Sequence, residues 1–316
     1  MPIGLGLACS HAPNVFIEPE NWETRYKQAI GDVPQPAAAA LETLEVRQAY
    51  AKRIDDAFAE LRKTLADYKP DALIMVTDDH NEMYDENLCQ PTIAMFLGET
   101  GSGTLTLKSV DEDPSQSQRV KVKCDQELSE FIAKGLMQRH FDVAVTRTKE
   151  TKSLGARDRG MGHGFTRTAP LLMPELNIPT VLIWLNCYFE PLPTARRCID
   201  LGRALRDICA KSKKRIAILG SGGLSHDPRG ARAGWIDEPL DRAILEALAE
   251  GEPDRLEALY KINSDTYHGG TGEIRNWLVV GGAMGETRAH IIDYMPVHHI
   301  ITGVGFATWD PNKQNA

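Results

Sequence analysis

Three histidines of this chain share one environment, because each comes soon after a short apolar run that indicates a buried strand. They are His11 after residues 3–8, His80 after 71–77 and His226 after 215–219. A lone histidine after a strand is more often a hydrogen-bonded structural residue, but three at equivalent positions favour a functional site. Histidines that converge in one site bind a metal ion or transfer protons, because imidazole titrates near neutral pH.

Metal binding would also need a carboxylate. Two histidines and one carboxylate leave a face of an Fe(II) ion open, and zinc takes the same ligands with a water. The candidate carboxylates are Asp78, Asp79, Glu82, Asp227 and Glu273. Asp79 is adjacent to His80, which discourages both from binding one ion. Glu273 lies in the first turn of an expected helix, where a charge that complements the helix dipole is the better explanation from composition alone.

A fourth histidine, His163, follows the least regular segment, residues 149–164, in which charged residues and glycine dominate. A loop of this length and composition is either a surface segment or an active-site loop. Arginines near His163 and His226 could pair with a substrate carboxylate, although surface charge is the expected role of most of them. These arginines are Arg157, Arg159, Arg167, Arg229 and Arg232.

The elements that must position these residues alternate along the chain. Apolar runs predict strands at 3–8, 71–77, 92–97, 142–146, 180–185 and 215–219. Apolar residues at helical spacing predict helices over 38–68, 124–139, 194–211, 238–250, 253–261 and 271–284. The polar residues 100–120 are expected to form an exposed hairpin or loop, and the C-terminus to return to short apolar pieces around 300–306.

This alternation indicates an α/β fold, with residues 1–316 as a single catalytic domain around a mostly parallel or mixed central sheet that carries helices on both faces. If the strands are parallel, their C-terminal ends lie along one edge of the sheet. The histidines that follow these strands would then converge from distant positions in the sequence.

Composition excludes several other functions. The formal net charge of -8 argues against nucleic acid or an anionic membrane as a partner. No window approaches the ~18 apolar residues of a membrane span, and the N-terminus lacks the basic region of a signal peptide. The six cysteines form no C-x-x-C pair, which is typical of reduced thiols in a cytoplasmic protein.

Common catalytic motifs are also missing. The glycine-rich stretch 220–225 lacks the third glycine of a dinucleotide-binding loop, so that interpretation is weak. The sequence contains no G-x-S-x-G nucleophile elbow, and no H-E-x-x-H zinc motif or P-loop.

Five segments, in this order, resemble the class III extradiol ring-cleaving dioxygenases, the superfamily of the protocatechuate 4,5-dioxygenase catalytic subunit. They are SHAP at 10–13, DH at 79–80, GHGF at 162–165, GSGGLSH at 220–226 and GEIRNW at 272–277. The stretch from Asn186 to Cys198 and the long helix expected at 38–68 are most similar to the gallate and methylgallate dioxygenase branch.

The resemblance implies that His11, His80 and Glu273 bind a non-haem Fe(II) ion. It also implies that His226 is the acid/base histidine and that His163 orients the substrate or handles a proton. The substrates would be a catechol-type aromatic diol and O₂. One departure is Gly162 before His163, where several relatives carry an acid.

Two alternatives stay open on the same scaffold, a zinc-dependent hydrolase and a non-catalytic metal-binding homologue. Some relatives need a small partner subunit. The length of this chain favours an enzyme that works without one, as a homodimer or larger homo-oligomer.

Overall fold

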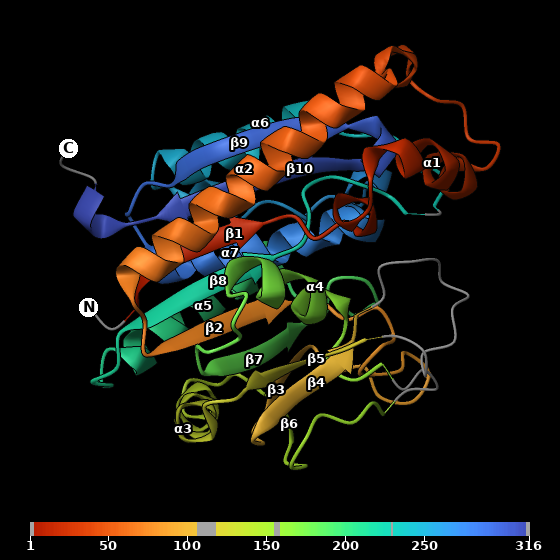
Figure 1. Cartoon of the computed structure of the whole chain (residues 1–316). Coiled ribbons are helices and arrows are strands. Elements are labelled where there is room, and N and C mark those ends of the chain that lie inside the picture. Colours follow the sequence, from red (N-terminus) through yellow and green to blue (C-terminus); the bar gives the residue numbers. More distant parts are fainter. Residues whose placement is uncertain (1–2, 106–117, 155–158, 229, 314–316) are drawn as a thin grey trace.

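The computed structural model describes residues 3–105, 118–154, 159–228 and 230–313. Eight strands form one mixed sheet (Figure 1). They are β1 (Ile3–Cys9), β2 (Ala72–Thr77), β3 (Ile93–Phe96), β6 (Ala144–Thr146), β7 (Thr180–Leu185), β8 (Ile216–Ser221), β9 (His290–Val297) and β10 (Thr302–Trp309). Their order across the sheet is β6-β3-β7-β2-β8-β1-β10-β9. Two further strands, β4 (Thr100–Thr104) and β5 (Arg119–Lys123), form a separate antiparallel hairpin.

The four central strands β7, β2, β8 and β1 run parallel to one another. Their neighbours β3 and β10 run antiparallel to them. The C-terminal ends of the central strands therefore lie along one edge of the sheet, where open α/β sheets bind ligands.

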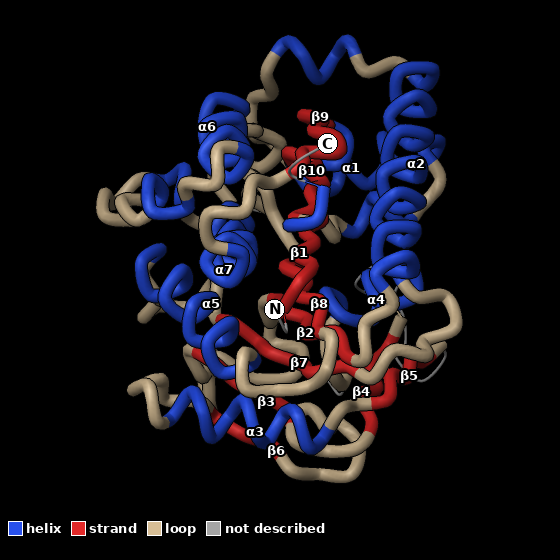
Figure 2. Tube along the Cα trace, turned by 90° about the vertical axis from the view of Figure 1, so that its left-hand side faces the viewer, coloured by secondary structure: helices blue, strands red, loops and turns tan. Residues whose placement is uncertain are grey.

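Helices cover both faces of this sheet. They are α1 (Trp22–Ile30), α2 (Leu44–Tyr68), α3 (Gln126–Met137), α4 (His163–Leu172), α5 (Ala195–Cys209), α6 (Glu238–Ala249) and α7 (Ile274–Met284). Figure 2 shows α5, α6 and α7 on one side of the sheet, with α2 and α4 on the other. The predicted α/β architecture, with a mixed sheet between two helical layers, is confirmed.

The central strands are buried on both faces, which explains their continuous apolar runs. In β8, Ile216 and Ile218 join the apolar cluster that contains α5 and α7. Ala217 and Leu219 point the other way, into the cluster that contains α2 and α4. Side chains alternate in this way because successive residues of a strand face opposite sides of the sheet.

Several boundaries differ from those predicted. The helix expected over 38–68 is a 3-10 turn at Ala37–Leu41 followed by α2, which begins after Thr43. The Thr43 side chain accepts the N–H of Val46 and so caps α2. The helix predicted over 253–261 is wrong, because the structure has only a 3-10 turn at Pro253–Leu256. Tyr260, inside the predicted span, has a φ of 66°, which lies in the left-handed region and cannot continue a right-handed helix.

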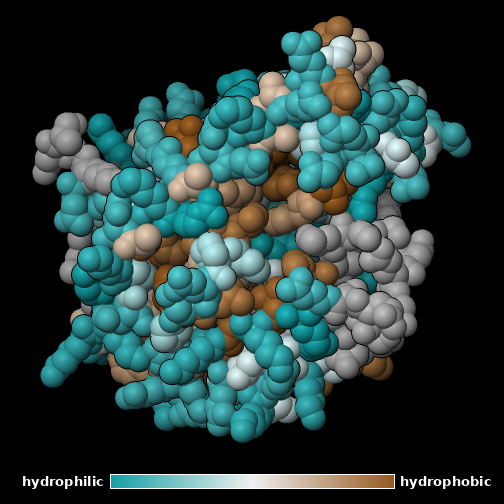
Figure 3. Space-filling view, viewed as in Figure 1, coloured by the Kyte–Doolittle hydropathy of each residue, from teal (hydrophilic) through white to brown (hydrophobic). Residues whose placement is uncertain are grey.

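The C-terminal segment contributes more than short apolar pieces, because β9 and β10 pair along most of their length. The predicted hairpin at 100–120 is present, but β4 is largely buried rather than exposed, and residues 106–117 lie outside the described residues. Apolar side chains on the face seen in Figure 3 gather mainly below α2 and around α4. Among the residues that the structure describes, no helix has both the length and the apolar character needed to cross a bilayer.

Candidate active site

The structure brings the five predicted site residues together. His11, His80 and His226 lie in the loops after β1, β2 and β8, at the C-terminal edge of the parallel strands. His163 is the first residue of α4, and its ring centroid lies 4.8 Å from those of both His11 and His80. Glu273 ends a 3-10 turn that leads into α7, and its carboxylate lies among the histidines.

Glu273 is the buried centre of the cluster. Its Oε2 lies 3.7 Å from Nε2 of His11, and its Oε1 lies 3.3 Å from Nε2 of His80 and 3.5 Å from Nε2 of His226. Burial alone would raise the pKa of Glu273, but its interactions with His226 and His11 outweigh burial and hold it well below its ordinary value. The carboxylate is therefore ionised and able to hold a cation.

The glycine-rich loop after β8 makes room for this carboxylate. The backbone N–H of Gly223 donates to Oε2 of Glu273 at 2.6 Å. Gly222 has a φ of 122°, and a Cβ at this position would lie only 2.7 Å from the same oxygen. Only glycine combines this backbone conformation with so close an approach. The loop that resembles a phosphate-binding turn in sequence thus serves as a cradle for Glu273.

A hydrogen bond on the side of the ring away from the carboxylates fixes the orientation of His11. Its Nδ1 makes a hydrogen bond of 2.9 Å with Oγ of Ser221, which leaves Nε2 facing the carboxylates. Burial lowers the pKa of His11 to about 4, so the ring is neutral at physiological pH. A neutral imidazole whose far nitrogen is hydrogen-bonded is the form that binds a metal ion.

His80 faces two carboxylates. Its Nε2 lies 2.7 Å from Oδ2 of Asp78, in addition to the contact with Glu273. Burial alone would lower the pKa of His80, but Asp78 and Glu273 outweigh burial and raise it well above its ordinary value. The pocket therefore stabilises a positive charge at this position, whether a proton or a metal ion carries it.

A buried nitrogen without a hydrogen bond shows that the pocket fits a metal ion. Nε2 of His11 is buried and makes no hydrogen bond, and it lies 3.6 Å from Oδ1 of Asp78 and 3.7 Å from Oε2 of Glu273. His11, Asp78 and Glu273 each offer one ligand atom within 4.8 Å of the other two. Ligand atoms bound about 2.1 Å from one divalent ion lie about 3.0–3.4 Å apart, and the contacts of His80 and His11 with the two carboxylates are between 2.7 and 3.7 Å.

His163 is paired with Glu82, a residue that the sequence offered only as a candidate carboxylate. Oε2 of Glu82 accepts the backbone N–H of His163 at 2.8 Å and lies 2.7 Å from Nδ1 of its ring. Burial alone would raise the pKa of Glu82, but His163 outweighs burial and holds it well below its ordinary value. Gly162, with a φ of 84°, leaves space for this pair, because a Cβ there would lie 3.1 Å from Oε2. The carboxylate beside His163 thus comes from the loop after β2.

A backbone contact at one ring nitrogen of His226 directs the other ring nitrogen toward the pocket. Its Nδ1 lies 2.9 Å from the carbonyl oxygen of Leu224, so Nδ1 carries the proton and Nε2 faces the pocket. Ser225 anchors the loop, because its N–H and Oγ both donate to Asp241 at 2.9 Å. Burial alone would lower the pKa of His226, but the charge of Glu273 outweighs burial and raises it.

Tyr188 was not predicted as a site residue. It lies in the loop after β7, its hydroxyl donates to Oε1 of Glu273, and its ring centroid is 4.0 Å from that of His80. Burial raises the pKa of Tyr188 well above its ordinary value, so it stays a protonated donor. The signal that identified the histidines, a polar side chain after a buried strand, would also have found Tyr188.

The described arginines have structural partners. Nη1 of Arg159 lies 3.5 Å from Glu82, and Arg232 donates to Thr266 at 2.6 Å. Arg167 is buried, with its guanidinium 5.6 Å from the centre of the Phe16 ring. The two remaining arginines, Arg157 and Arg229, lie outside the described residues.

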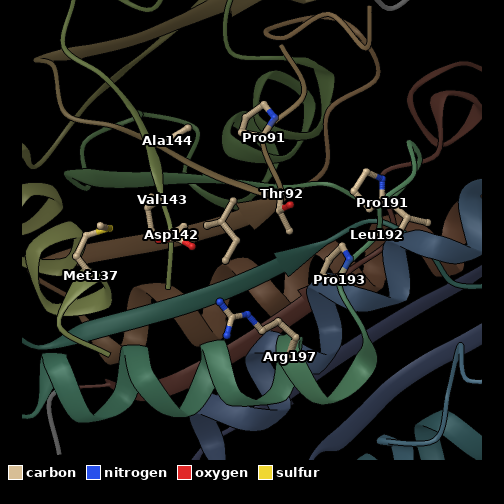
Figure 4. Close-up of a pocket in the computed structure, with 11 residues that line it drawn as sticks. Pro91, Thr92, Met137, Asp142, Val143, Ala144, Pro191, Leu192, Pro193 and Arg197 are labelled. Atoms are coloured by element: carbon tan, nitrogen blue, oxygen red, sulfur yellow. The ribbon is translucent and has the colours of Figure 1, made fainter. Parts of the chain in front are cut away.

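Among the described residues, the site is more exposed beside His80 and His163 than beside His11. The side chains of His80 and His163 are 29% and 13% exposed, whereas that of His11 is 2% exposed. A broad groove elsewhere, near the edge of the sheet, is lined by residues such as Pro91, Asp142 and Arg197 (Figure 4), and none of the site histidines lines it. The groove is therefore separate from the histidine cluster.

Comparison with known proteins identifies the class. The family described as "Catalytic LigB subunit of aromatic ring-opening dioxygenase" matches residues 32–305, a range that contains His80, His163, His226 and Glu273 and begins after His11. The chain belongs to this family and is a ring-cleaving extradiol dioxygenase by class.

Curated relatives cover most of the chain. A 2,3-dihydroxyphenylpropionate/2,3-dihydroxicinnamic acid 1,2-dioxygenase of Photorhabdus laumondii is 24% identical over 84% of this chain and 93% of its own length. One from a Rhodococcus species is 26% identical over 81% of this chain and 90% of its own. The gallate dioxygenase of Pseudomonas putida is 30% identical over 54% of this chain and 49% of its own. A crystal structure of an uncharacterized Escherichia coli K12 protein has the same fold, with a TM-score of 0.52, 14% identity and coverage of 97% of this chain and 99% of its own.

Proposed function

We propose that the protein is an Fe(II)-dependent extradiol dioxygenase that opens a catechol-type aromatic ring next to its diol, with His11, His80 and Glu273 holding the metal ion. The observation that carries this proposal is the convergence of Nε2 of both histidines on one ionised, buried carboxylate. A metal ion held by two histidines and one carboxylate would keep positions open for the diol and for O₂.

Bound Fe(II) would supply the Lewis acidity that lowers the pKa of a phenolic hydroxyl and the redox chemistry that O₂ requires. The protein residues supply the proton transfers. Nε2 of His226 is the nitrogen that faces the pocket, because Nδ1 is bonded to a backbone carbonyl. This nitrogen is placed to accept the proton of a substrate hydroxyl and to return it later.

His163 has a different task. Its Nδ1 is held by Glu82, so Nε2 is the nitrogen left for a substrate oxygen. Because His163 lies on the open side of the site, we propose that it contacts the substrate and orients the diol. The contact of 2.7 Å between Oε2 of Glu82 and Nδ1 of His163 holds the ring in this orientation.

The substrate class follows from the relatives, which are named for dihydroxyphenylpropionate, dihydroxycinnamate and gallate. All of these are acids that carry adjacent ring hydroxyls. We propose that the substrate is an acid of this kind. The described arginines near the site already have partners, so they do not favour one of these acids over another.

The test is O₂ uptake by protein loaded anaerobically with Fe(II). The panel contains gallate, protocatechuate, 3-O-methylgallate and 2,3-dihydroxyphenylpropionate. We expect equimolar consumption of O₂ and substrate with a coloured ring-opened product for at least one of them. No O₂ consumption across the panel by protein that has bound one equivalent of iron would overturn the proposal.

Metal analysis separates the proposal from its alternatives. A zinc-dependent hydrolase would retain stoichiometric zinc and show no iron-dependent turnover. A non-catalytic homologue would bind metal but gain nothing from an intact His226. We further propose that the chain is one catalytic domain that assembles as a homo-oligomer in the cytoplasm, which size-exclusion chromatography with light scattering and cell fractionation would test.

A further inference from the structure

Ser221 is the last residue of β8, and its side chain faces α4. In this strand, Ala217 and Leu219 point into the apolar cluster that contains α2 and α4, and Ser221 continues the same alternating row. The residue is buried, and its carbonyl oxygen accepts the side-chain N–H of Asn276 at 2.8 Å. The Ser221 hydroxyl is therefore held at the end of a central strand, on the side of the sheet that α4 covers.

A glycine lets α4 lie close to the same point. A Cβ on Gly164 would overlap Oγ1 of Thr77 and would lie 3.1 Å from Cε1 of His11. Thr168 is buried and lies four residues later, on the same face of the helix. Its Oγ1 is 3.0 Å from Oγ of Ser221. The helix thus brings a second hydroxyl to the buried end of β8.

The Ser221 hydroxyl connects this second hydroxyl to His11. Its Oγ lies 2.9 Å from Nδ1 of His11 and 3.0 Å from Oγ1 of Thr168. The third neighbour, Sγ of Cys9, is 3.9 Å away, and sulfur is a weak acceptor. Because a hydroxyl has only one proton to donate, the role of Ser221 toward His11 determines its role toward Thr168.

The tautomer of His11 sets the direction of these hydrogen bonds. A neutral imidazole has one N–H group and one lone pair. If Nε2 binds a metal ion through its lone pair, Nδ1 carries the proton and donates to Ser221, and Ser221 donates to Thr168. If Thr168 donates to Ser221 and Ser221 donates to Nδ1, the ring proton is on Nε2, where it blocks metal binding. Only the first direction is compatible with a metal ion.

We propose that Ser221 and Thr168 are positioning residues of the metal centre, because Thr168 accepts the proton of Ser221 and so favours the tautomer of His11 that binds the ion. This inference rests on the proposed function, because it assumes a metal ion at Nε2 of His11. Since α4 begins with His163, the same helix would support both a metal ligand and the histidine that contacts the substrate.

The experiment measures metal affinity rather than turnover. Metal-free protein is titrated with Co(II), which replaces Fe(II) as a spectroscopic probe, in competition with a chelator. Ser221→Ala removes the first hydroxyl. Thr168→Val removes the second and keeps the shape of the side chain, whereas Thr168→Ser keeps the hydroxyl. Thr166→Val is the matched control, because Thr166 is buried in the same helix and its Oγ1 donates to the carbonyl oxygen of Thr104 instead.

We expect Ser221→Ala to weaken Co(II) binding about 10–100-fold and Thr168→Val to weaken it about 2–10-fold. Both variants should change the visible absorption bands of bound Co(II). Thr168→Ser should restore the affinity, and Thr166→Val should bind like the wild type. Equal affinities of Thr168→Val and Thr166→Val, with both variants folded by circular dichroism, would overturn the inference.

The double variant separates a hydrogen-bonded chain from two independent effects on the fold. If Thr168 acts through Ser221, adding Thr168→Val to Ser221→Ala should cause no further loss of Co(II) affinity, because the group through which it acts is already missing. Losses that multiply in the double variant would show that the two residues act separately and would contradict the proposed chain.

His11→Ala and Glu273→Gln distinguish this inference from the proposed function. If these two variants lose Co(II) binding while Ser221→Ala and Thr168→Val bind like the wild type, only the role of the two hydroxyls is wrong. If all four variants bind Co(II) like the wild type, the proposed metal centre itself is wrong.

Discussion

Glu82 accepts two hydrogen bonds from His163, one from the backbone N–H at 2.8 Å and one from ring Nδ1 at 2.7 Å. The pair joins the loop after β2 to the start of α4, two segments that are 81 residues apart. It fixes both the position of the histidine and the tautomer of its ring. The carboxylate thereby directs Nε2 of His163 toward the open side of the site.

Glu82→Gln should lower kcat about 10–100-fold, because a hydrogen bond to a charged group contributes about 1.5–3 kcal/mol. The amide keeps the size of the side chain but removes the charge of the acceptor that holds Nδ1 of His163. Steady-state O₂ uptake with the best substrate of the panel would measure this effect. Iron content should stay at the wild-type value, and the exposed Glu86→Gln should behave like the wild type. A kcat equal to that of Glu86→Gln would contradict the role of Glu82.

His226→Ala should separate catalysis from metal binding. Loss of a positioned acid/base typically costs about 10²–10⁴ in rate, whereas the proposed metal ligands remain in place. Iron content and kcat are measured on the same preparation. His290→Ala is the matched control, because its side chain is 69% exposed and pairs with Glu60 on the surface. A variant that loses iron together with activity would show that His226 holds the metal ion instead.

The position of the histidines at one edge of the sheet could be predicted from the sequence, because each histidine lies close in sequence to the strand that positions it. Each apolar run is long enough for one buried strand, and a histidine follows within a few residues of its end. Parallel strands then place these histidines together. The same local signal is present at Tyr188, which follows β7 and contacts Glu273.

The partners of the histidines could not be predicted in this way. Glu273 follows no strand, and its place in the cluster depends on how α7 packs against β1 and β8. Its sequence context is that of any helix N-terminus, so only the family resemblance selected it. Asp78 and Glu82 were both candidates, but sequence spacing cannot show which histidine a carboxylate in the loop after β2 will face. β9 was missed because most of it is half-buried and lacks a clear alternation.

Tyr188→Phe should weaken metal binding while keeping the fold. The substitution removes the hydroxyl that donates to Oε1 of Glu273 and keeps the ring that packs on His80. Loss of an outer hydrogen bond to a metal ligand costs about 10–100-fold in metal affinity. Chelator competition with Co(II) would measure the change. Tyr267→Phe, in which the ring packs on Tyr260, is the control, and equal affinities of the two variants would contradict the prediction.

Gly222→Ala should damage the site more than the fold. A Cβ at this position would lie 2.7 Å from Oε2 of Glu273, and the φ of 122° is unfavourable for alanine. The carboxylate would have to move away from His11. We expect loss of stoichiometric iron in protein that still unfolds cooperatively. Normal iron content in this variant would show that Glu273 is not tied to this loop.

Asp241, which anchors the loop before His226, should make the free energy of unfolding depend on pH. Burial raises the pKa of Asp241 to about 6, whereas an aspartate in an unfolded chain titrates near about 3.9. Between these values the folded state holds more protons than the unfolded state, so the free energy of unfolding falls as pH rises from about 4 to about 6. A difference of roughly two pKa units corresponds to roughly 3 kcal/mol.

Asp241→Asn cannot ionise. Its free energy of unfolding, relative to that of the wild type, should therefore increase by roughly 3 kcal/mol as pH rises from about 4 to about 6. Urea unfolding of metal-free protein at pH 4, 5, 6 and 7 measures this difference, with the exposed Asp56→Asn as the control. A difference between Asp241→Asn and the wild type that does not change with pH would show that Asp241 titrates normally.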